Sequence, residues 1–301
     1  MLTRVLIMGG YVGGYNNTNV IEIYDPYDGT ASRIADAEML VATQVSAASN
    51  VDDTIYLIGG GIFLPTNQVA LINNVQLFNY LTGKTEYSDT LEVFRAGAAA
   101  TTLDNKVYAC GGADYHGRML SSCLVYSPRV DKPSWSHISD MTIARSQFGL
   151  VAYRNYLLAI GGLSENGLVT SCERYSPLEN KWQNTNATLD QPAWLLSAAV
   201  YNNSVVVCGG ITDIQTGKVT DQCQSYKHGE ETFTSFASLN QKKSGLKLVT
   251  VGNTLLAIGG SGQIGELSRA VEFYNASSHT WEHARSLVMG RWGAAVVGVS
   301  R

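Results

Sequence analysis

The segment Val107-Tyr108-Ala109-Cys110-Gly111-Gly112 joins a short apolar run to a pair of glycines. An apolar run of this length that ends at glycine is typical of a strand buried on both faces. Two adjacent glycines permit positive φ, or a close backbone approach that any side chain would block. The segment therefore predicts a buried strand that ends at a tightly packed turn.

The same unit occurs six times along the chain. The glycine pairs are Gly9-Gly10, Gly59-Gly60, Gly111-Gly112, Gly161-Gly162, Gly209-Gly210 and Gly259-Gly260. Successive pairs are 50, 52, 50, 48 and 50 residues apart. Self-similarity at such a period indicates a repeat architecture in which each repeat is one supersecondary unit.

Three further strands are predicted at fixed places in each unit. A strand of small residues precedes the glycine pair, as in residues 96–102 after Arg95. An alternating strand follows a polar loop and ends at an aromatic residue, which is Tyr24, Phe78, Tyr126, Tyr175, Tyr226 or Tyr274. A fourth strand carries Trp135, Trp182, Phe233 or Trp281 in four units. Four strands in each of six units predict an all-β, six-bladed β-propeller with four antiparallel strands per blade.

The two ends of the chain are expected to share one blade. The chain begins at a second strand, and residues 291–298 have the character of a first strand with no glycine pair behind them. Pairing these strands closes the ring and removes the open sheet edges that would otherwise pair with other chains. The expected blades are residues 1–37 with 290–301, 38–91, 92–141, 142–190, 191–240 and 241–289 in a single domain.

Composition narrows the possible functions. The net charge is -4 and the pI is about 5.7, with no dense Lys/Arg run to follow a phosphate backbone, so we expect no nucleic-acid partner. No stretch approaches the roughly 20 apolar residues of a membrane helix, and the N-terminal run is too short for a signal peptide. We therefore expect no membrane partner, and the odd, thinly spread cysteines favour a reducing, cytoplasmic setting.

The five cysteines follow the repeat. Cys123, Cys172 and Cys223 stand three residues before the aromatic of the third strand, and Cys110 and Cys208 precede glycine pairs. Other units have Ile, Val or Met at these positions, so the cysteines behave as small core side chains. From this pattern and the odd count we expect no disulfide framework, no metal site and no redox site.

These features together resemble kelch repeats. The resemblance rests on the glycine pairs, the spaced tryptophans, Tyr24-Asp25-Pro26, Tyr126-Ser127-Pro128 and Tyr175-Ser176-Pro177, and it covers essentially the whole chain. Closure by a C-terminal first strand looks like the kelch domains of the BTB-kelch substrate adaptors of cullin-RING ubiquitin ligases. The resemblance implies a domain that binds a protein client or short peptide, with the cullin engaged only through flanking domains outside this sequence.

Two alternatives come with the same resemblance. Several kelch proteins bind actin, which makes an actin-binding cytoskeletal scaffold the first alternative. A sugar mutarotase built on a kelch propeller is the second. The sequence has no phosphate-binding loop, nucleophile elbow or other catalytic signature, so we expect a protein that is not an enzyme and needs no cofactor.

Three arginines recur at one position of the repeat. Arg95 and Arg145 stand sixteen residues before a glycine pair, and Arg291 occupies the same position before the last strand. One reading is structural, with each arginine packed between blades and bonded to loop carbonyls. The other places them at the mouth of the central channel, where they would pair with an acidic partner.

Strand alternation brings two sets of loops to one face. The loops between second and third strands and the loops between blades emerge together, and the first set is where the six units differ most. Tyr, Trp and Arg are enriched at binding hot spots. The candidate partner-binding residues on this face are Tyr11, Tyr15, Asn16, Phe63, Arg95, Tyr115, His116, Arg118, Arg145, Gln147, Trp194, Arg291 and Trp292.

Overall fold

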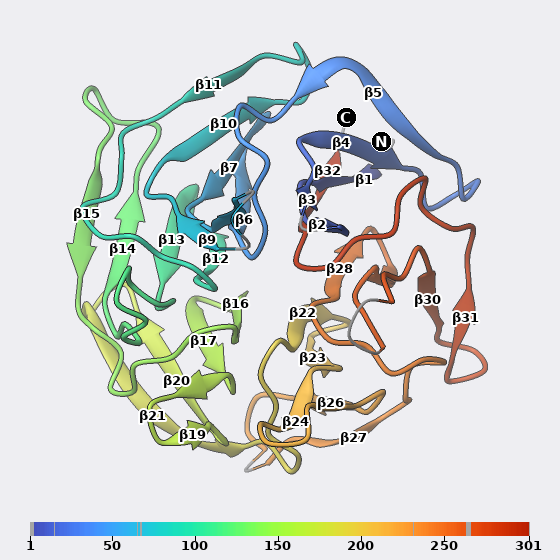
Figure 1. Ribbon diagram of the computed structural model, residues 1–301. Coiled ribbons are helices and arrows are strands. Elements are labelled where there is room, and N and C mark those ends of the chain that lie inside the picture. The colour runs from blue at the N-terminus through green and yellow to red at the C-terminus, as the bar shows by residue number, and fades with distance from the viewer. Residues whose placement is uncertain are drawn as a thin grey trace.

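The computed structural model describes residues 3–14, 16–64, 66, 68–230, 232–262 and 266–300. Within these residues, six four-stranded antiparallel sheets stand around a central axis, and the chain visits them in order (Figure 1). This confirms the all-β, six-bladed propeller expected from the glycine repeat. The described residues contain no helix with the length and hydrophobicity needed to cross a membrane.

Each blade is numbered by its place in the chain, with its strands given from the axis outward. Blade 1 contains β32 (Ala295–Ser300), β1 (Thr3–Met8), β4 (Val20–Tyr24) and β5 (Ala31–Glu38). Blade 2 contains β6 (Ala47–Val51), β7 (Thr54–Ile58), β10 (Val75–Asn79) and β11 (Thr85–Tyr87). Blade 3 contains β12 (Ala99–Leu103), β13 (Lys106–Cys110), β14 (Cys123–Tyr126) and β15 (Trp135–Ile138).

The other three blades repeat this order. Blade 4 contains β16 (Gly149–Tyr153), β17 (Tyr156–Ile160), β20 (Ser171–Ser176) and β21 (Lys181–Thr188). Blade 5 contains β22 (Ser197–Tyr201), β23 (Ser204–Cys208), β26 (Cys223–Tyr226) and β27 (Thr234–Phe236). Blade 6 contains β28 (Lys247–Val251), β29 (Thr254–Ile258), β30 (Val271–Asn275) and β31 (Thr280–His283).

Short two-stranded ribbons stand in the loops between second and third strands. They are β2 (Tyr11–Gly13) with β3 (Asn16–Asn17), β8 (Gly61–Phe63) with β9 (Val69–Leu71), β18 (Leu163–Ser164) with β19 (Gly167–Leu168), and β24 (Ile211–Asp213) with β25 (Lys218–Val219). The loops of blades 3 and 6 have only isolated bridges there. The loop face therefore differs from blade to blade while the sheets below it stay alike.

The ring closes inside blade 1. Strand β32 pairs with β1 along its whole length, from Thr3 opposite Ser300 to Met8 opposite Ala295. The last strand thus lies innermost in the blade that the first strand began, as the sequence predicts. Closure covers the edge of β1 that faces the axis, which would otherwise be open to pairing.

The glycine pairs join each blade to the next. In every pair the N–H of the second glycine donates to the carbonyl that precedes the next blade's first strand, as Gly10 does to Thr43 at 2.7 Å and Gly162 to Ala193 at 3.0 Å. A Cβ on Gly9 would lie only 2.6 Å from the same carbonyl oxygen of Thr43. The expected positive φ and close backbone approach are therefore both present.

The hydrophobic core is divided into six clusters, each between two adjacent blades. The aromatic at the end of each third strand contributes to these clusters. In blade 3 its ring packs on the fourth-strand tryptophan, with 5.2 Å between the centroids of Tyr126 and Trp135, and in blade 4 the separation of Tyr175 and Trp182 is 5.3 Å. Cross-strand aromatic pairs of this kind stabilise a sheet beyond the area they bury.

The repeated arginines lie inside the protein. Arg145 forms an ion pair with Glu173 and also donates to the carbonyls of Gly161 and Ser171. Arg291 binds Glu22 in the same way, and Lys243 binds Glu272 in blade 6. Burial lowers the pKa of Arg145 and of Arg291, and the negative charge of the paired glutamate acts against this shift.

Arg95 differs because no carboxylate among the described residues forms an ion pair with it. Its guanidinium donates to the carbonyls of Gly111 and Ser122 and to the hydroxyl of Ser122. Burial lowers the pKa of Arg95 to about 10, with Asp140 acting against the shift. Arg95, Arg145 and Arg291 are at most 1% exposed. The structural reading of the three arginines is therefore the correct one, and their proposed place on the partner-binding face was wrong.

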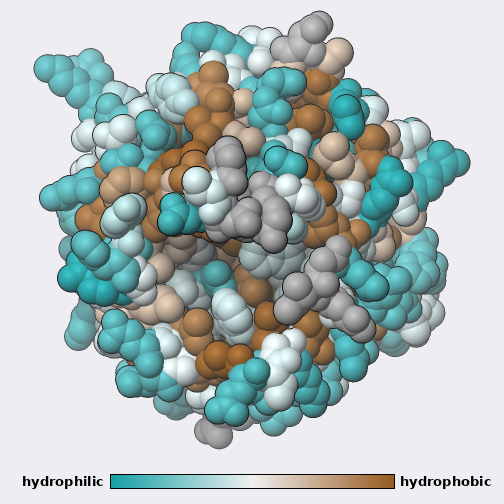
Figure 2. All heavy atoms as spheres, in the orientation of Figure 1, coloured by the Kyte–Doolittle hydropathy of each residue, from teal (hydrophilic) through white to brown (hydrophobic). Residues whose placement is uncertain are grey.

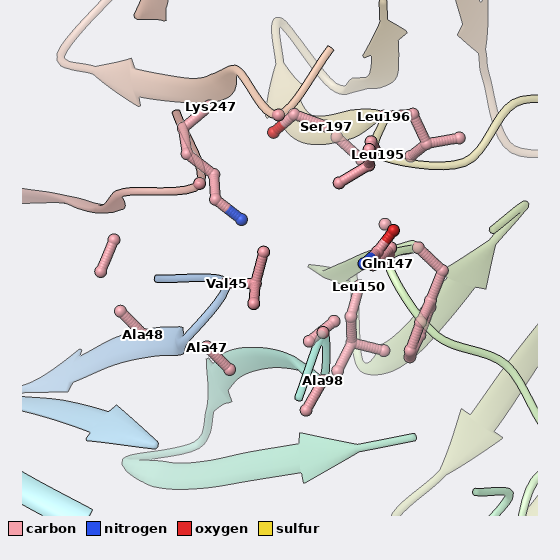
Figure 3. A pocket seen from close by; sticks show the side chains of 18 of the residues that line it. Val45, Ala47, Ala48, Ala98, Gln147, Leu150, Leu195, Leu196, Ser197 and Lys247 are labelled. Carbon is pink, nitrogen blue, oxygen red and sulfur yellow. The ribbon is translucent and has the colours of Figure 1, made fainter. Parts of the chain in front are cut away.

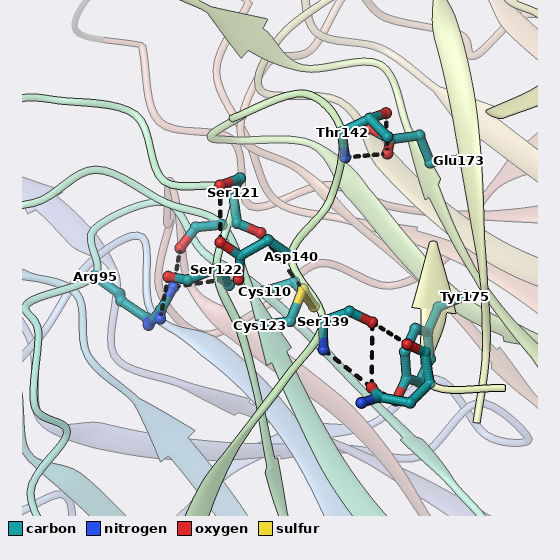
Figure 4. The surroundings of a disulfide bond; sticks show 12 residues. Arg95, Cys110, Ser121, Ser122, Cys123, Ser139, Asp140, Thr142, Glu173 and Tyr175 are labelled. Carbon is teal, nitrogen blue, oxygen red and sulfur yellow. Dashed lines mark hydrogen bonds between the residues drawn. A yellow bond between two sulfur atoms is a disulfide. The ribbon is translucent and has the colours of Figure 1, made fainter. Parts of the chain in front are cut away.

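Four of the five cysteines form disulfides, which the sequence analysis did not expect. Cys110 and Cys123 are bonded across strands β13 and β14 (Figure 4), and Cys208 and Cys223 across β23 and β26. Each pair occupies directly opposed positions of the sheet register. Cys172 is also buried, and it remains a free thiol because the residue opposite it is Ile160. The replacement of these cysteines by Ile or Val in other units correctly predicted that they are buried. Two buried cysteines that lie opposite each other can nevertheless form a disulfide.

Candidate functional site

A closed ring of backbone hydrogen bonds surrounds the axis at the entrance to the channel. Each member donates its N–H to the carbonyl of the equivalent residue in the preceding blade, with N···O distances of 2.7–3.1 Å. The members, in order, are Gly293, Val45, Gly97, Gln147, Leu195 and Gly245. All six have φ between 49° and 66°, a region that costs a residue with a side chain roughly 1–2 kcal/mol. The blades therefore meet at a rigid frame.

Beside this frame lies a pocket of about 820 Å³. Its volume is within the usual range for ligand-binding clefts, about 300–1,000 Å³. Its walls come from the loops of blades 1, 2, 5 and 6, and the apolar side chains among them are Tyr11, Leu195, Ile211, Val219, Leu267 and Trp292. In Figure 2, hydrophobic side chains gather around the central hollow of the face and hydrophilic ones surround them towards the rim.

Trp292 is held in the pocket wall from two sides. Its backbone exchanges hydrogen bonds with Tyr11, at 2.9 Å and 3.1 Å. Its indole lies against the Cα of Gly245, where a Cβ would collide with the ring nitrogen. Since both contacts are made to the backbone of neighbouring loops, Trp292 presents a fixed aromatic surface to the pocket.

Two lysines add positive charge to the pocket. Lys218 at the tip of ribbon β24–β25 and Lys242 at the end of the loop before β28 are both exposed. No Asp or Glu is among the described residues that line the pocket. An apolar wall with two ammonium groups suits a segment that carries an apolar anchor and a carboxylate.

A second aromatic patch stands on the loop of blade 3. Asp114 accepts hydrogen bonds from the N–H groups of His116 and Arg118 and from Nε of Arg118. Burial opposes ionisation of Asp114, but the bonds from Arg118 and His116 outweigh it and keep the pKa of this carboxyl below its usual value. The fixed turn projects Tyr115, which is 69% exposed and lies 5.9 Å from the ring of Phe94.

The structure separates the predicted surface residues into groups. Tyr11 and Trp292 line the pocket. Tyr115, His116 and Arg118 stand together on blade 3 and do not line it. Asn16 is exposed on ribbon β2–β3. Tyr15 and the side chain of Phe63 lie outside the described residues.

Two further predicted residues sit closer to the axis. Gln147 belongs to the backbone ring and its side chain points into the channel rather than outward (Figure 3). Trp194 is half-buried and its backbone bridges Ile211. Its indole nitrogen is buried without a partner among the described residues.

Sequence reasoning missed several pocket residues. Ile211, Val219 and Leu267 lie on loops that the sequence analysis treated as polar or small. A signal was present for Ile211, because it directly follows a glycine pair, as Tyr11 does in blade 1. The residue at this place bridges to the loop before the first strand of its own blade. The described residues include no group of three or more His, Cys, Asp or Glu that could hold a metal ion.

Comparison with known proteins agrees with the repeat. The family model "Kelch motif" matches residues 95–142 and 144–185. Kelch-like protein 36 of Rattus norvegicus is 26% identical over 208 residues, covering 66% of this chain and 33% of the relative. Kelch-like protein 40 of Xenopus tropicalis is 29% identical over 169 residues, covering 56% of this chain and 27% of the relative.

A viral relative and a solved structure complete the comparison. Kelch repeat and BTB domain-containing protein 1 of cowpox virus (strain Brighton Red) is 28% identical, covering 67% of this chain and 36% of the relative. The chain thus matches about a third of the length of these relatives. The structure of YjhT superposes with a TM-score of 0.76 at 14% identity, covering 93% of this chain and 97% of that one, which shows the fold alone.

The motif matches fall on blades 3 and 4. The hydrogen bond from the glycine pair to the next blade and the buried third-strand aromatic of these two blades recur in the other four. Named kelch-like proteins align with more than half of the chain. The chain is a six-bladed β-propeller that contains kelch motifs and is similar to kelch-like proteins.

Proposed function

We propose that this propeller is a non-enzymatic module that binds a short segment of a client protein. The observation that carries the proposal is the pocket of about 820 Å³, with Trp292 fixed in one wall and Lys218 and Lys242 at its rim. The segment places an apolar side chain against Trp292 and a carboxylate near the lysines. Rigid aromatic anchors in a desolvated pocket typically supply most of the binding energy of such interfaces.

The kelch-like relatives support a more specific role. One of them is named for a BTB domain as well as for its kelch repeats. We propose that the chain is the substrate-recognition part of a cullin-RING ubiquitin-ligase adaptor that acts in the cytoplasm. Flanking domains engage the cullin, and the propeller presents the client without bond chemistry of its own.

Site-specific photo-crosslinking tests the binding face. A photoreactive phenylalanine analogue at Lys242 is expected to crosslink the client in lysate, identified by mass spectrometry. The control is the same analogue at Leu178, which is 98% exposed on the turn between β20 and β21, at the opposite face. Trp292→Ala is expected to abolish the Lys242 crosslink. A crosslink that forms equally at Leu178, or that survives Trp292→Ala, overturns the proposed pocket.

The adaptor role needs a separate measurement in the full-length protein. Immunoprecipitation is expected to recover a cullin with both the native protein and the Trp292→Ala variant, because the cullin does not use the pocket. Ubiquitination of the crosslinked client is expected only with the native protein. Client binding without a cullin would leave the protein-binding proposal standing and overturn the adaptor proposal.

A further inference from the structure

One charged side chain, Lys247, stands among the residues that line the central channel. It begins the innermost strand of blade 6, paired with the residue that precedes the glycine pair. The equivalent residues of the other blades are Ala295, Ala47, Ala99, Gly149 and Ser197. Small side chains are what a narrow channel accommodates, so the repeat itself does not explain a lysine here.

Among the described residues that line the channel, no carboxylate balances this charge. The cavity of about 130 Å³ is lined by the first strands of all six blades, and its described lining includes no Asp or Glu. Lys243, four residues earlier, is different because its ammonium lies 2.5 Å from Glu272. Burial lowers the pKa of Lys247, which reflects the cost of a cation that water does not fully solvate.

Polar groups converge with Lys247 on the same space. Figure 3 shows Lys247 and Gln147 entering the channel from opposite sides. The Gln147 side chain has a buried Oε1 with no hydrogen-bond partner among the described residues. The Ser197 oxygen accepts the N–H of Leu248 at 2.8 Å, which leaves its own hydroxyl hydrogen available. A buried amide oxygen without a partner is rare in folded proteins and needs a donor, such as a water or the Lys247 ammonium, which leaves the NH2 group of Gln147 to face a ligand.

The size of the space limits what it can hold. A cavity of about 150 Å³ is known to hold one benzene molecule, so the channel cavity of about 130 Å³ suits a ligand no larger than about six non-hydrogen atoms. The backbone ring, with the side chains of Val45, Gln147 and Leu195, narrows the entrance. Phosphorylated peptides and sugars are too large for this space.

We propose that the channel binds one small monovalent anion, a halide or a short carboxylate such as formate, on Lys247. The ammonium supplies the opposite charge, and the Ser197 hydroxyl and the Gln147 amide supply hydrogen bonds. Such an anion plays for Lys247 the part that Glu272 plays for Lys243. This site is independent of the client pocket and does not rest on the proposed function.

Thermal unfolding at constant ionic strength tests the site. Sodium gluconate, whose anion is too large for the cavity, is replaced stepwise by chloride, bromide, formate or acetate. The unfolding temperature of the native protein is expected to rise with saturation at one site. Comparing the four anions distinguishes a halide site from a carboxylate site. Lys247→Met is expected to abolish the rise, whereas Lys242→Met, at an exposed lysine, keeps it.

A milder variant and a direct probe cover the case in which Lys247→Met misfolds. Ser197→Ala is expected to fold and to weaken the anion affinity about tenfold, as the loss of a hydrogen bond to a charged group does. Bromide soaked into crystals is expected to give anomalous density beside Lys247. The proposal is overturned if the native protein shows no saturable rise, if Lys247→Met retains it, or if bromide density is absent from the channel.

Discussion

Arg145 and Glu173 form an ion pair, 2.7 Å between nitrogen and oxygen, in which neither side chain is exposed to solvent. Glu173 also accepts the backbone N–H groups of Thr142 and Ile143. In blades 2 and 5 the cation is replaced by Thr43 or Ala193, and glutamine takes the place of the glutamate. These glutamines, Gln76 and Gln224, make the same backbone bonds without charge. Buried charge is therefore matched within these blades.

This matching predicts coupling between the two residues of blade 4. Glu173→Gln leaves the Arg145 guanidinium buried without a counter-charge and is expected to cost about 3 kcal/mol of unfolding free energy. The double variant Arg145→Ala/Glu173→Gln copies blade 5. Urea unfolding of both single variants and the double variant is expected to give a coupling energy of about 1–3 kcal/mol. Additive losses would contradict the matching of charge within the blade.

The disulfides are expected to contribute measurably to stability. They close loops with sequence separations of 13 and 15 residues, for which loss of unfolded-state entropy gives up to about 3 kcal/mol each. Cys110→Val/Cys123→Val places in blade 3 an apolar pair like those of other blades. The urea midpoint of this variant is expected to fall. Dithiothreitol is expected to lower the urea midpoint of the native protein, but to leave unchanged the midpoint of a variant that lacks both disulfides.

Cys172 is expected to weaken the protein at alkaline pH. Burial raises the pKa of its thiol to about 12, with Arg145 acting against the shift. The unfolded thiol ionises near pH 9, so the folded state retains the proton longer and stability falls as pH rises from 9 to 12. Between pH 9 and 10 the native protein is expected to lose about 1 kcal/mol more than Cys172→Val. Parallel stability curves for the two proteins would refute this.

Gly245→Ala is expected to disturb the pocket that Trp292 lines without altering any of the polar groups of that pocket. The added methyl collides with the indole of Trp292 and forces it out of the wall. Tryptophan fluorescence is expected to shift to longer wavelength, and client crosslinking at Lys242 is expected to fall at least tenfold. Gly217→Ala, at an open position with positive φ in the same pocket, is the matched control for backbone strain. Equal losses in both variants would show that the indole position does not matter.

The scaffold was predictable because its determinants recur along the chain, the glycine pairs and third-strand aromatics in all six units and the fourth-strand Trp or Phe in four. The glycine pairs, the third-strand aromatics and the fourth-strand tryptophans each occupy one structural place, so strand number, strand order and ring closure followed from the sequence. The buried state of the arginines could also have been read from it. In blades 1 and 4 the residue two places before the third-strand aromatic is Glu22 or Glu173, which pairs with an arginine.

The disulfides were missed although a signal was present. The residue before the glycine pair lies opposite the residue three places before the third-strand aromatic. Cysteine occupies both places in units three and five, whereas Cys172 has Ile160 opposite it. Treating each position separately hid this pairing. The client pocket could not be predicted in the same way, because its walls come from loops of unequal length that meet only once the blades are packed.

The pairing of β1 with β32 also determines how the propeller responds to mechanical force. Thr3 lies opposite Ser300, so both ends of the described chain emerge from the same end of the strand pair. A pull that separates the termini therefore unzips the hydrogen bonds one after another instead of shearing all of them together. Once β32 has peeled away, blade 1 has lost its innermost strand and blade 6 a neighbour. The β1–β32 pair that closes the ring is therefore expected to separate at low force when the chain is pulled by its two ends.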